Sequence, residues 1–139
     1  MAKDMFSKQA DAYSAYRPLY PPELYGWLLQ QIPPPHHLAW DAGTGNGQVA
    51  AVLARHFERV LATDLSAAQL AKAHQVPNIT YRQSQADASG LDDNSVDLVC
   101  VAQAMHWFDL DTFFPEVDRV VRPGGLFAVW GYKIPESET

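Results

Sequence analysis

The sequence predicts an α/β protein with a doubly wound parallel sheet of about five strands and a helical cap at its N-terminus. From residue 37 onward, short apolar strand patterns alternate with helical patterns. A glycine-rich turn, "DAGTGNG" at residues 41–47, joins the first strand pattern to the first helical pattern. With 139 residues, of which 47% are hydrophobic, the chain is large and apolar enough to bury one core.

The segment before residue 37 is predicted to be helical. Residues 5–17 and 23–32 both carry apolar side chains at helical spacing. The proline clusters in "RPLYPPE" and "IPPPHH" separate these two helices from each other and from the rest of the chain. We therefore expect an N-terminal helical cap over residues 1–36 and a sheet domain over residues 37–139.

Five strands are predicted in the second region. Each is a short run of apolar and β-branched residues bounded by turn residues. They span residues 37–41, 59–64, 79–83, 95–102 and 125–131.

Three helices are predicted between these strands. The helix after the glycine turn has an apolar face of Val49, Val52, Leu53 and Phe57. The next spans residues 67–74 and begins with Ser66 and, three residues later, Gln69, the pattern of a capping box. "RPGG" at residues 122–125 ends the last helix, in which Pro115 must lie in the first turn or bend the axis. Its apolar face comprises Val117, Val120 and Val121.

Composition favours a small-molecule partner. The formal charge is -6 and no Lys/Arg cluster is present, which argues against nucleic acid or an anionic membrane. The N-terminus has no apolar stretch long enough for a signal or a membrane span, and the single cysteine, Cys100, cannot form an internal disulfide. We expect a cytoplasmic protein with a buried Cys100. His36 and His37 lack further ligands, so no metal is expected.

The glycine turn is the predicted ligand site. In a doubly wound sheet, the ligand lies beyond the carboxyl ends of the strands and meets the first strand-to-helix turn. Glycine permits positive φ angles and close approach of a ligand, and the following helix offers N–H groups and a positive dipole end. Asp64 ends the next strand, where an acid can accept hydrogen bonds from both hydroxyls of a ribose. These features predict a nucleoside ligand.

The spacing of the glycines separates two classes of nucleoside. A dinucleotide fingerprint starting at Gly43 would need Gly or Ala at position 48, where the sequence has Gln48. The run "DAGTGNG" instead resembles the first motif of class I S-adenosylmethionine-dependent methyltransferases. The resemblance implies a Rossmann-like sheet with strand order 3-2-1-4-5. It also implies that the cofactor contacts the turn through Asp41, Gly43, Thr44, Gly45 and Gly47.

Later segments resemble further motifs of this family, in the same order. "ATDLS" is similar to the second motif, which implies that Asp64 binds the ribose and that Leu65 packs against adenine. "QADASGLDDNSVDLV" is similar to the third, which implies that Asp87 accepts from the adenine amine and that the Ala88 N–H donates to a ring nitrogen. Asp87 also has a simpler interpretation as a solvated loop acid that caps a turn.

Two segments would serve the methionine end of the cofactor and the acceptor. The front of the chain is similar to the cap of small-molecule methyltransferases related to trans-aconitate methyltransferases, in which Tyr13 and Arg17 would close over the methionine end. "VAQAMHWFD" follows the fourth strand, where Gln103 would hold the sulfonium end and His106 is the candidate general base. The alternatives are a structural contact for Tyr13 and Arg17, a strand end for Gln103, and a packed pair of His106 with Trp107.

The sheet of this family has seven strands, in the order 3-2-1-4-5-7-6, and the sequence stops just after the fifth. We therefore expect the apolar fifth strand to be an unpaired edge that forms a dimer or a larger assembly. The leading functional hypothesis is S-adenosylmethionine-dependent methyl transfer to a small-molecule acceptor. A module that binds the cofactor without turnover and an NAD-dependent oxidoreductase are the alternatives.

Overall fold

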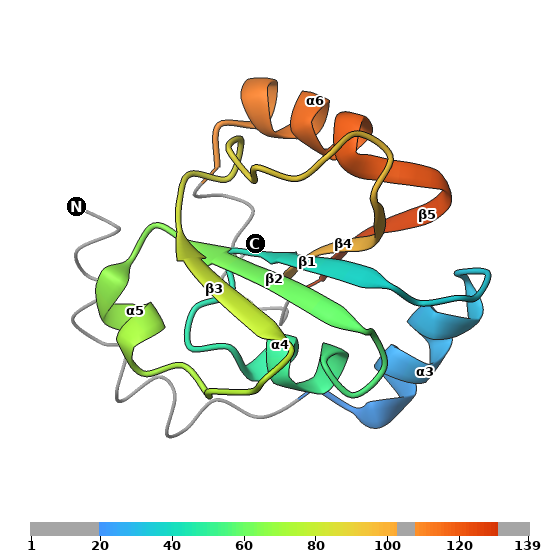
Figure 1. The fold of residues 1–139 in the computed structure, drawn as a ribbon, viewed down its shortest axis with the longest axis horizontal. Helices are drawn as coiled ribbons and strands as arrows, with labels where there is room; N and C mark the ends of the chain where they lie inside the picture. Colours follow the sequence, from blue (N-terminus) through green and yellow to red (C-terminus); the bar gives the residue numbers. More distant parts are fainter. Residues whose placement is uncertain (1–19, 103–107, 131–139) are drawn as a thin grey trace, which may run out of the picture.

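A computed structural model describes residues 20–102 and 108–130. Its five strands form one parallel sheet in the order β3-β2-β1-β4-β5, as predicted (Figure 1). In chain order the elements are α3 (Pro22–Gln30), β1 (Leu38–Ala42), α4 (Gln48–Leu53), β2 (Arg59–Asp64), α5 (Ala67–Ala71), β3 (Ile79–Gln83), β4 (Val96–Ala102), α6 (Leu110–Val120) and β5 (Val121–Trp130).

The two central strands are buried on both faces. Every residue of β1 and of β4 is buried, as expected for parallel strands covered by helices. Residue Ala39 of β1 lies opposite Val60 of β2 on one side and Leu98 of β4 on the other. Because both neighbours are parallel, the carboxyl ends of β1, β2 and β4 meet at the same edge of the sheet.

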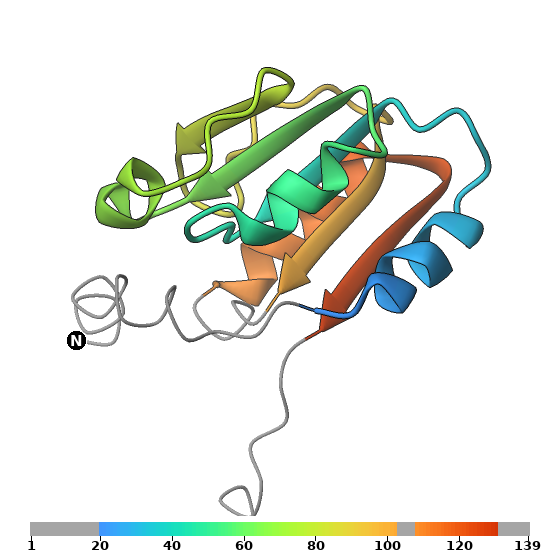
Figure 2. The same cartoon turned by 90° about the horizontal axis from the view of Figure 1, so that it is seen from below.

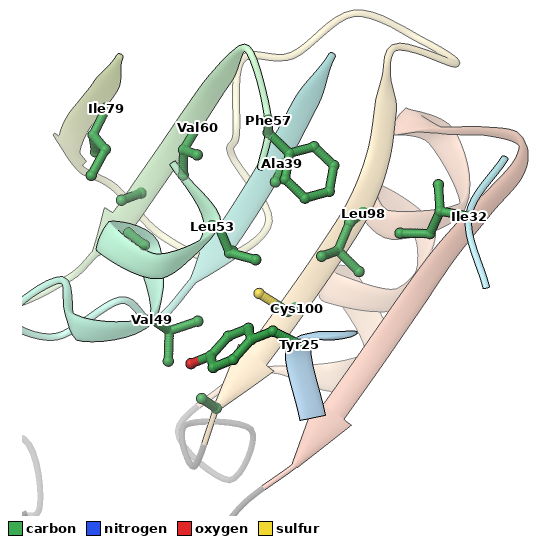
Figure 3. Close-up of a cluster of buried hydrophobic side chains, with 13 residues drawn as sticks. Tyr25, Ile32, Ala39, Val49, Leu53, Phe57, Val60, Ile79, Leu98 and Cys100 are labelled. Carbon is green, nitrogen blue, oxygen red and sulfur yellow. The ribbon is translucent and has the colours of Figure 1, made fainter. Parts of the chain in front are cut away.

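Helices cover both faces of the sheet. On one face, side chains of α3 and α4 pack on the strands, with Val49, Leu53 and Tyr25 facing Ala39 and Leu98 (Figure 3). On the other face lies α6, whose Phe113, Val117 and Val120 are buried against the strands (Figure 2). The Trp40 ring contacts Phe113 edge-on, with ring centroids 5.9 Å apart. The result is the three-layer arrangement that the alternating pattern predicts.

The capping of α5 differs from the predicted box. The Ser66 side chain accepts a hydrogen bond from the Gln69 N–H, which is the first half of a capping box. The second half is replaced, because the Ser66 N–H donates to Asp64 Oδ1 at 2.8 Å and the Gln69 side chain is buried instead. Asp64 therefore takes over a bond that the local pattern assigns to Gln69. The helix ends at Ala71, three residues earlier than predicted.

The prediction that Val121 belongs to the last helix is wrong. α6 ends at Val120, and Val121 has an extended backbone with ψ 127° and lies opposite Val96 in the sheet. Pairing with β4 therefore begins before "RPGG", which forms an irregularity in β5 between the positions opposite Val96 and Leu98. Pro115 lies inside α6, beyond its first turn.

Asp97 joins the starts of three strands. Its buried carboxylate accepts hydrogen bonds from the N–H groups of His37 and Leu38, at 2.6 and 2.8 Å, and from Nε of Arg122. Arg122 also donates to the Pro33 carbonyl at 2.9 Å. This network ties β1, β4 and β5 together at the edge opposite the glycine turn.

The described part of the N-terminal region packs on the sheet. Tyr25 and Ile32 belong to the same buried cluster as β1 and β4. The rings of Tyr20 and Tyr25 meet Trp130 edge-on, with centroids 5.7 and 6.3 Å apart. The helix predicted over residues 5–17 lies outside the described residues, and the division of the chain at residue 36 stays a prediction.

β5 forms one edge of the sheet, as predicted. Its side chains are half-buried or exposed, and that of Val129 is 49% exposed. Within residues 20–102 and 108–130, no helix is both long and apolar enough to cross a membrane.

Candidate functional site

The glycine turn has the backbone that its sequence requires. Gly43, Gly45 and Gly47 have φ angles of 74°, 61° and 85°, a region that side chains disfavour. A Cβ on Gly47 would lie 2.4 Å from the hydroxyl oxygen of Tyr81, which itself donates to the His74 carbonyl at 2.6 Å. Position 47 therefore admits no side chain.

The N–H groups of this turn are largely used inside the protein. Those of Gly43 and Thr44 donate to the Thr63 carbonyl at 2.9 and 2.8 Å, and that of Gly47 donates to the Thr44 carbonyl at 3.0 Å. The Gly45 N–H donates to Asp64 Oδ2 at 2.9 Å. At these four positions the turn offers close approach to its Cα atoms rather than free donors.

Asp41 and Thr44 brace the turn from within. Thr44 Oγ1 donates to Asp41 Oδ2 at 2.7 Å, and the Cys100 thiol donates to Asp41 Oδ1 at 3.6 Å. Asp41 and Thr44 are only 1% and 6% exposed. Cys100 is fully buried as predicted, and burial together with the Asp41 charge raises the pKa of its thiol well above the ordinary value. Direct contact of Asp41 or Thr44 with a ligand stays a prediction.

Asp64 stands beside the turn with its carboxylate held by the backbone. Oδ2 accepts from the Gly45 N–H and Oδ1 from the Ser66 N–H, at 2.9 and 2.8 Å. Burial raises the pKa of Asp64, although these bonds and one from the Leu65 N–H act to lower it. Each carboxylate oxygen has two lone-pair directions. With three backbone N–H groups donating, one of the four directions remains to accept a hydroxyl.

A cavity of about 220 Å³ is lined by Leu65, the residue after Asp64, and by residues that follow β3 and precede or begin α6. Drug-sized ligands occupy about 300–1,000 Å³, so this cavity suits a single ring system rather than a whole cofactor. Two residues predicted for one base site, Leu65 and Asp87, both line it. Leu65 follows β2 and Asp87 follows β3, so the fold brings them together from separate segments.

The cavity also has lining residues that the sequence did not single out. Phe108, Asp109 and Thr112 come from the start of α6 and its cap. Asp109 caps the helix by accepting from the Asp111 N–H at 3.1 Å, and its place at the end of the segment "VAQAMHWFD" was the available signal. The aromatic ring of Phe108 and the carboxylates of Asp87 and Asp109 suit a flat base that carries a donor group.

Ala88 lies outside this lining. Ala88 is exposed, and its N–H donates to the Gln85 carbonyl at 3.1 Å. A hydrogen bond to a ring nitrogen would require that bond to be exchanged, so the role of Ala88 stays a prediction. Four other predicted site residues lie outside the described residues: Tyr13, Arg17, Gln103 and His106.

Comparison with known proteins gives the family. Residues 40–129 match the family described as a methyltransferase domain, which is more than half of the chain. This chain belongs to that methyltransferase family. The predicted resemblance to class I S-adenosylmethionine-dependent methyltransferases is confirmed.

Relatives of this methyltransferase domain come from distant organisms. An uncharacterized methyltransferase of Mycobacterium tuberculosis is 40% identical over 127 residues, which are 90% of this chain and 51% of the relative. A candidate methyltransferase of Dictyostelium discoideum is 37% identical over 129 residues, which are 93% of this chain and 49% of the relative. The solved structure of a candidate type II methyltransferase from Anaeromyxobacter dehalogenans is 45% identical, with a TM-score of 0.80.

The methyltransferase chain spans about half the length of the curated relatives it matches. The same holds for the Anaeromyxobacter structure. The match covers 86% of this chain and 50% of that structure's chain.

Proposed function

We propose that this chain binds S-adenosylmethionine and serves methyl transfer to a small-molecule acceptor. The observation that carries the proposal is the hydrogen bond of 2.9 Å between the Gly45 N–H and Asp64 Oδ2. It holds a sugar-binding carboxylate beside a turn that a ligand can approach closely. Membership of the methyltransferase domain family supports the choice of this nucleoside.

The residues present fit the parts of this cofactor. The remaining lone-pair direction of the Asp64 carboxylate suits a ribose hydroxyl. The cavity lined by Leu65, Asp87 and Phe108 suits a base with an exocyclic amine, because a carboxylate accepts from an amine and apolar side chains pack on the ring. We assign the methionine end to Tyr13, Arg17 and Gln103 on the basis of the resemblance.

When bound, S-adenosylmethionine supplies a methyl group attached to a positively charged sulfur atom. The protein then has to orient the acceptor and exclude water, since this transfer needs no covalent enzyme intermediate. For a hydroxyl or amine acceptor, His106 is the proposed general base, because an imidazole can take up a proton near neutral pH. A carboxylate acceptor is already ionised and would need no base.

A second candidate is a module that binds the cofactor without catalysing transfer. The observation that favours it is that the site residues within the described part of the chain bear on cofactor binding, whereas the proposed base, His106, lies outside that part. The third hypothesis, an NAD-dependent oxidoreductase, is disfavoured by the family match and by Gln48 in place of the third fingerprint glycine.

Isothermal titration calorimetry tests the cofactor. We expect S-adenosylmethionine and S-adenosylhomocysteine to bind and NAD not to bind. Asp64→Ala should weaken binding by more than about 1 kcal/mol, because hydrogen bonds to a charged acceptor are lost. Asp118→Ala, which removes an exposed carboxylate from α6, is the control and should bind as the wild type does. Full affinity in Asp64→Ala would remove Asp64 from the site, and a folded protein that ignores both nucleosides would refute the proposal.

Transfer of a labelled methyl group separates the enzyme from the binding module. The protein is incubated with labelled S-adenosylmethionine and a panel of small carboxylic acids, alcohols and amines. Labelled product supports turnover by this chain. Tight cofactor binding without product from any acceptor favours the binding module.

We also propose that the edge of β5 pairs with a second copy of the chain. The exposed side chain of Val129 supports this, as does Phe114, which is 43% exposed and contacts Phe127 with centroids 6.2 Å apart. We also propose a cytoplasmic location, because the single cysteine is a buried free thiol and a reducing compartment keeps thiols free.

A further inference from the structure

The segment that carries Asp87 is a loop, residues 84–95, without regular secondary structure between β3 and β4. Its most buried residue is Ser89, which is 0% exposed. Both the N–H and the hydroxyl of Ser89 donate to one atom, Glu116 Oε2 on α6, at 3.1 and 2.6 Å. The Ser89 part of the loop is therefore attached to α6 through the Glu116 carboxylate. The end of the loop is joined to α6 by the Asn94 and Ser95 N–H groups, which donate to the Arg119 and Val120 carbonyls.

Glu116 is held in place for this contact. Its side chain is 11% exposed, and the Arg119 guanidinium pairs with it at 3.0 Å to Oε1 and 2.9 Å to Oε2. Arg119 also donates to Asp93 Oδ1 at 2.8 Å, so the same pair reaches the loop at a second point. A largely buried carboxylate requires such compensation of its charge.

The loop is held from the sheet as well. Nη1 of Arg82, in β3, donates to the Ser89 carbonyl, and the Leu91 N–H donates to Ser89 Oγ at 3.1 Å. Gly90 has a φ of 74°, and a Cβ there would lie 2.9 Å from Arg82 Nη1. All hydrogen-bonding groups of Ser89 are thus used, two residues after Asp87.

The helix that holds this loop also lines the cavity beside Leu65 and Asp87. Thr112 of α6 and its cap Asp109 belong to the same lining. A shift of the loop relative to α6 would therefore change the width of the cavity and the direction of the Asp87 carboxylate together.

We propose that Glu116 is a positioning residue for recognition of the cofactor base: by holding Ser89, it sets Asp87 to accept from a purine that carries an exocyclic amine. The inference rests on the proposed function of the cavity. Glu116 pairs with the partly exposed Arg119, but its other partner is the fully buried Ser89. Loss of Glu116 leaves both donors of Ser89 without their acceptor.

The test compares two ligands that differ at the amine. Affinities for S-adenosylhomocysteine and for its hypoxanthine analogue, S-inosylhomocysteine, are measured by calorimetry on the wild type, Glu116→Ala and Ser89→Ala. The wild type should prefer the adenine ligand, because Asp87 cannot accept from the hypoxanthine carbonyl. Glu116→Ala should reduce this preference by about five-fold or more, and Ser89→Ala, which keeps the backbone N–H donor, by less.

Asp118→Ala is the matched control, because it removes an exposed acid from the same helix and should leave the preference unchanged. A loss of affinity that is equal for both ligands would overturn the proposal, since a purely structural role lowers both alike. An unchanged preference in Glu116→Ala would overturn it too. If Glu116→Ala does not fold, the proposal is tested on Ser89→Ala alone. An unchanged preference for the adenine ligand in Ser89→Ala would then overturn the proposal.

Amide hydrogen exchange separates this inference from the proposed function. Glu116→Ala should exchange faster over residues 84–91, while peptides of β1 and β4 stay protected. If the wild type binds neither ligand, the proposed function fails, and with it the assignment to base recognition. Faster exchange of residues 84–91 in Glu116→Ala would then still support the attachment of the loop through Glu116. Unchanged exchange of these residues would overturn the attachment as well.

Discussion

At the scale of single residues, the candidate site depends on two positions with opposite requirements. Gly47 must have no side chain, because the Tyr81 hydroxyl occupies the space beside it. Asp64 must keep a carboxylate, because the Gly45 and Ser66 N–H groups both donate to it. One residue gives the turn its shape and the other links the turn to β2.

Gly47→Ala should destabilise the protein by about 1–3 kcal/mol, because the new Cβ meets Tyr81 and the φ of 85° is unfavourable for alanine. Urea unfolding followed by circular dichroism measures the change. Gly26→Ala is the control, since a Cβ there meets nothing within 4 Å, and it should be neutral or stabilise α3. Equal stability of Gly47→Ala and the wild type would contradict the described contact with Tyr81.

At the scale of the elements, ends and connections carry more of the site than the centres of strands do. The loop between β3 and β4 takes its position from α6 and from Arg82 rather than from a helix of its own. At the opposite edge, Asp97 performs a comparable task by joining the starts of β1 and β4 to Arg122.

The Asp97 network should make stability depend on pH. Burial alone would raise the pKa of Asp97, but bonds from Arg122 and from the Leu38 and His37 N–H groups bring it below its ordinary value. The lowered pKa means that this stabilisation is fully present above the unfolded value, about 3.9, and is lost as the pH falls through the folded value.

Asp97→Asn should therefore cost about 3 kcal/mol at pH 7, because it leaves the Arg122 charge without its partner. The difference from the wild type should begin to shrink below about pH 4, where the unfolded carboxyl takes up a proton, and should go on shrinking as the pH falls through the lowered pKa of the folded state. Thermal unfolding between pH 3 and pH 7 measures this, with Asp118→Asn as the exposed control. A difference that stays constant over this range would contradict a role for the Asp97 charge.

At the scale of the whole molecule, the sheet has one buried centre and one exposed apolar edge. β5 pairs with β4 on one side, and Val129, at 49% exposed, marks its accessible side chains. Such an edge offers unpaired N–H and C=O groups to another strand. The remainder of a longer chain and a second copy of this one would compete for the same edge.

Val129→Lys tests the proposed pairing of copies. Light scattering at micromolar concentration should give a dimer or larger assembly for the wild type and a monomer for the variant, since an edge lysine resists strand pairing. Glu23→Lys also introduces a lysine, at an exposed position on α3, and should leave the assembly intact. A monomeric wild type would refute the proposed assembly.

Much of the fold and part of the site can be predicted from local sequence patterns. The five strands and the glycine turn were predicted because burial on both faces, positive φ angles and turn residues leave short-range signals, whereas the edge position of β5 was predicted from the strand order of the family. Leu65 and Asp87 were assigned to one site through resemblance, and the fold brings them to one cavity. Tyr13, Arg17, Gln103 and His106 stay predictions.

By itself, the sequence determined the strands and helices of the parallel sheet and the turn that meets the ligand, because each strand and helix shows its own burial through its hydrophobic periodicity, while the strand order followed from the resemblance to the family. Only the tertiary structure decided that Val121 pairs with Val96, that Asp64 replaces Gln69 in the cap of α5, and that Glu116 holds Ser89. These contacts depend on how elements far apart in the chain pack together. The hydrophobic periodicity of each element carries no information about which polar groups will meet once the elements have packed.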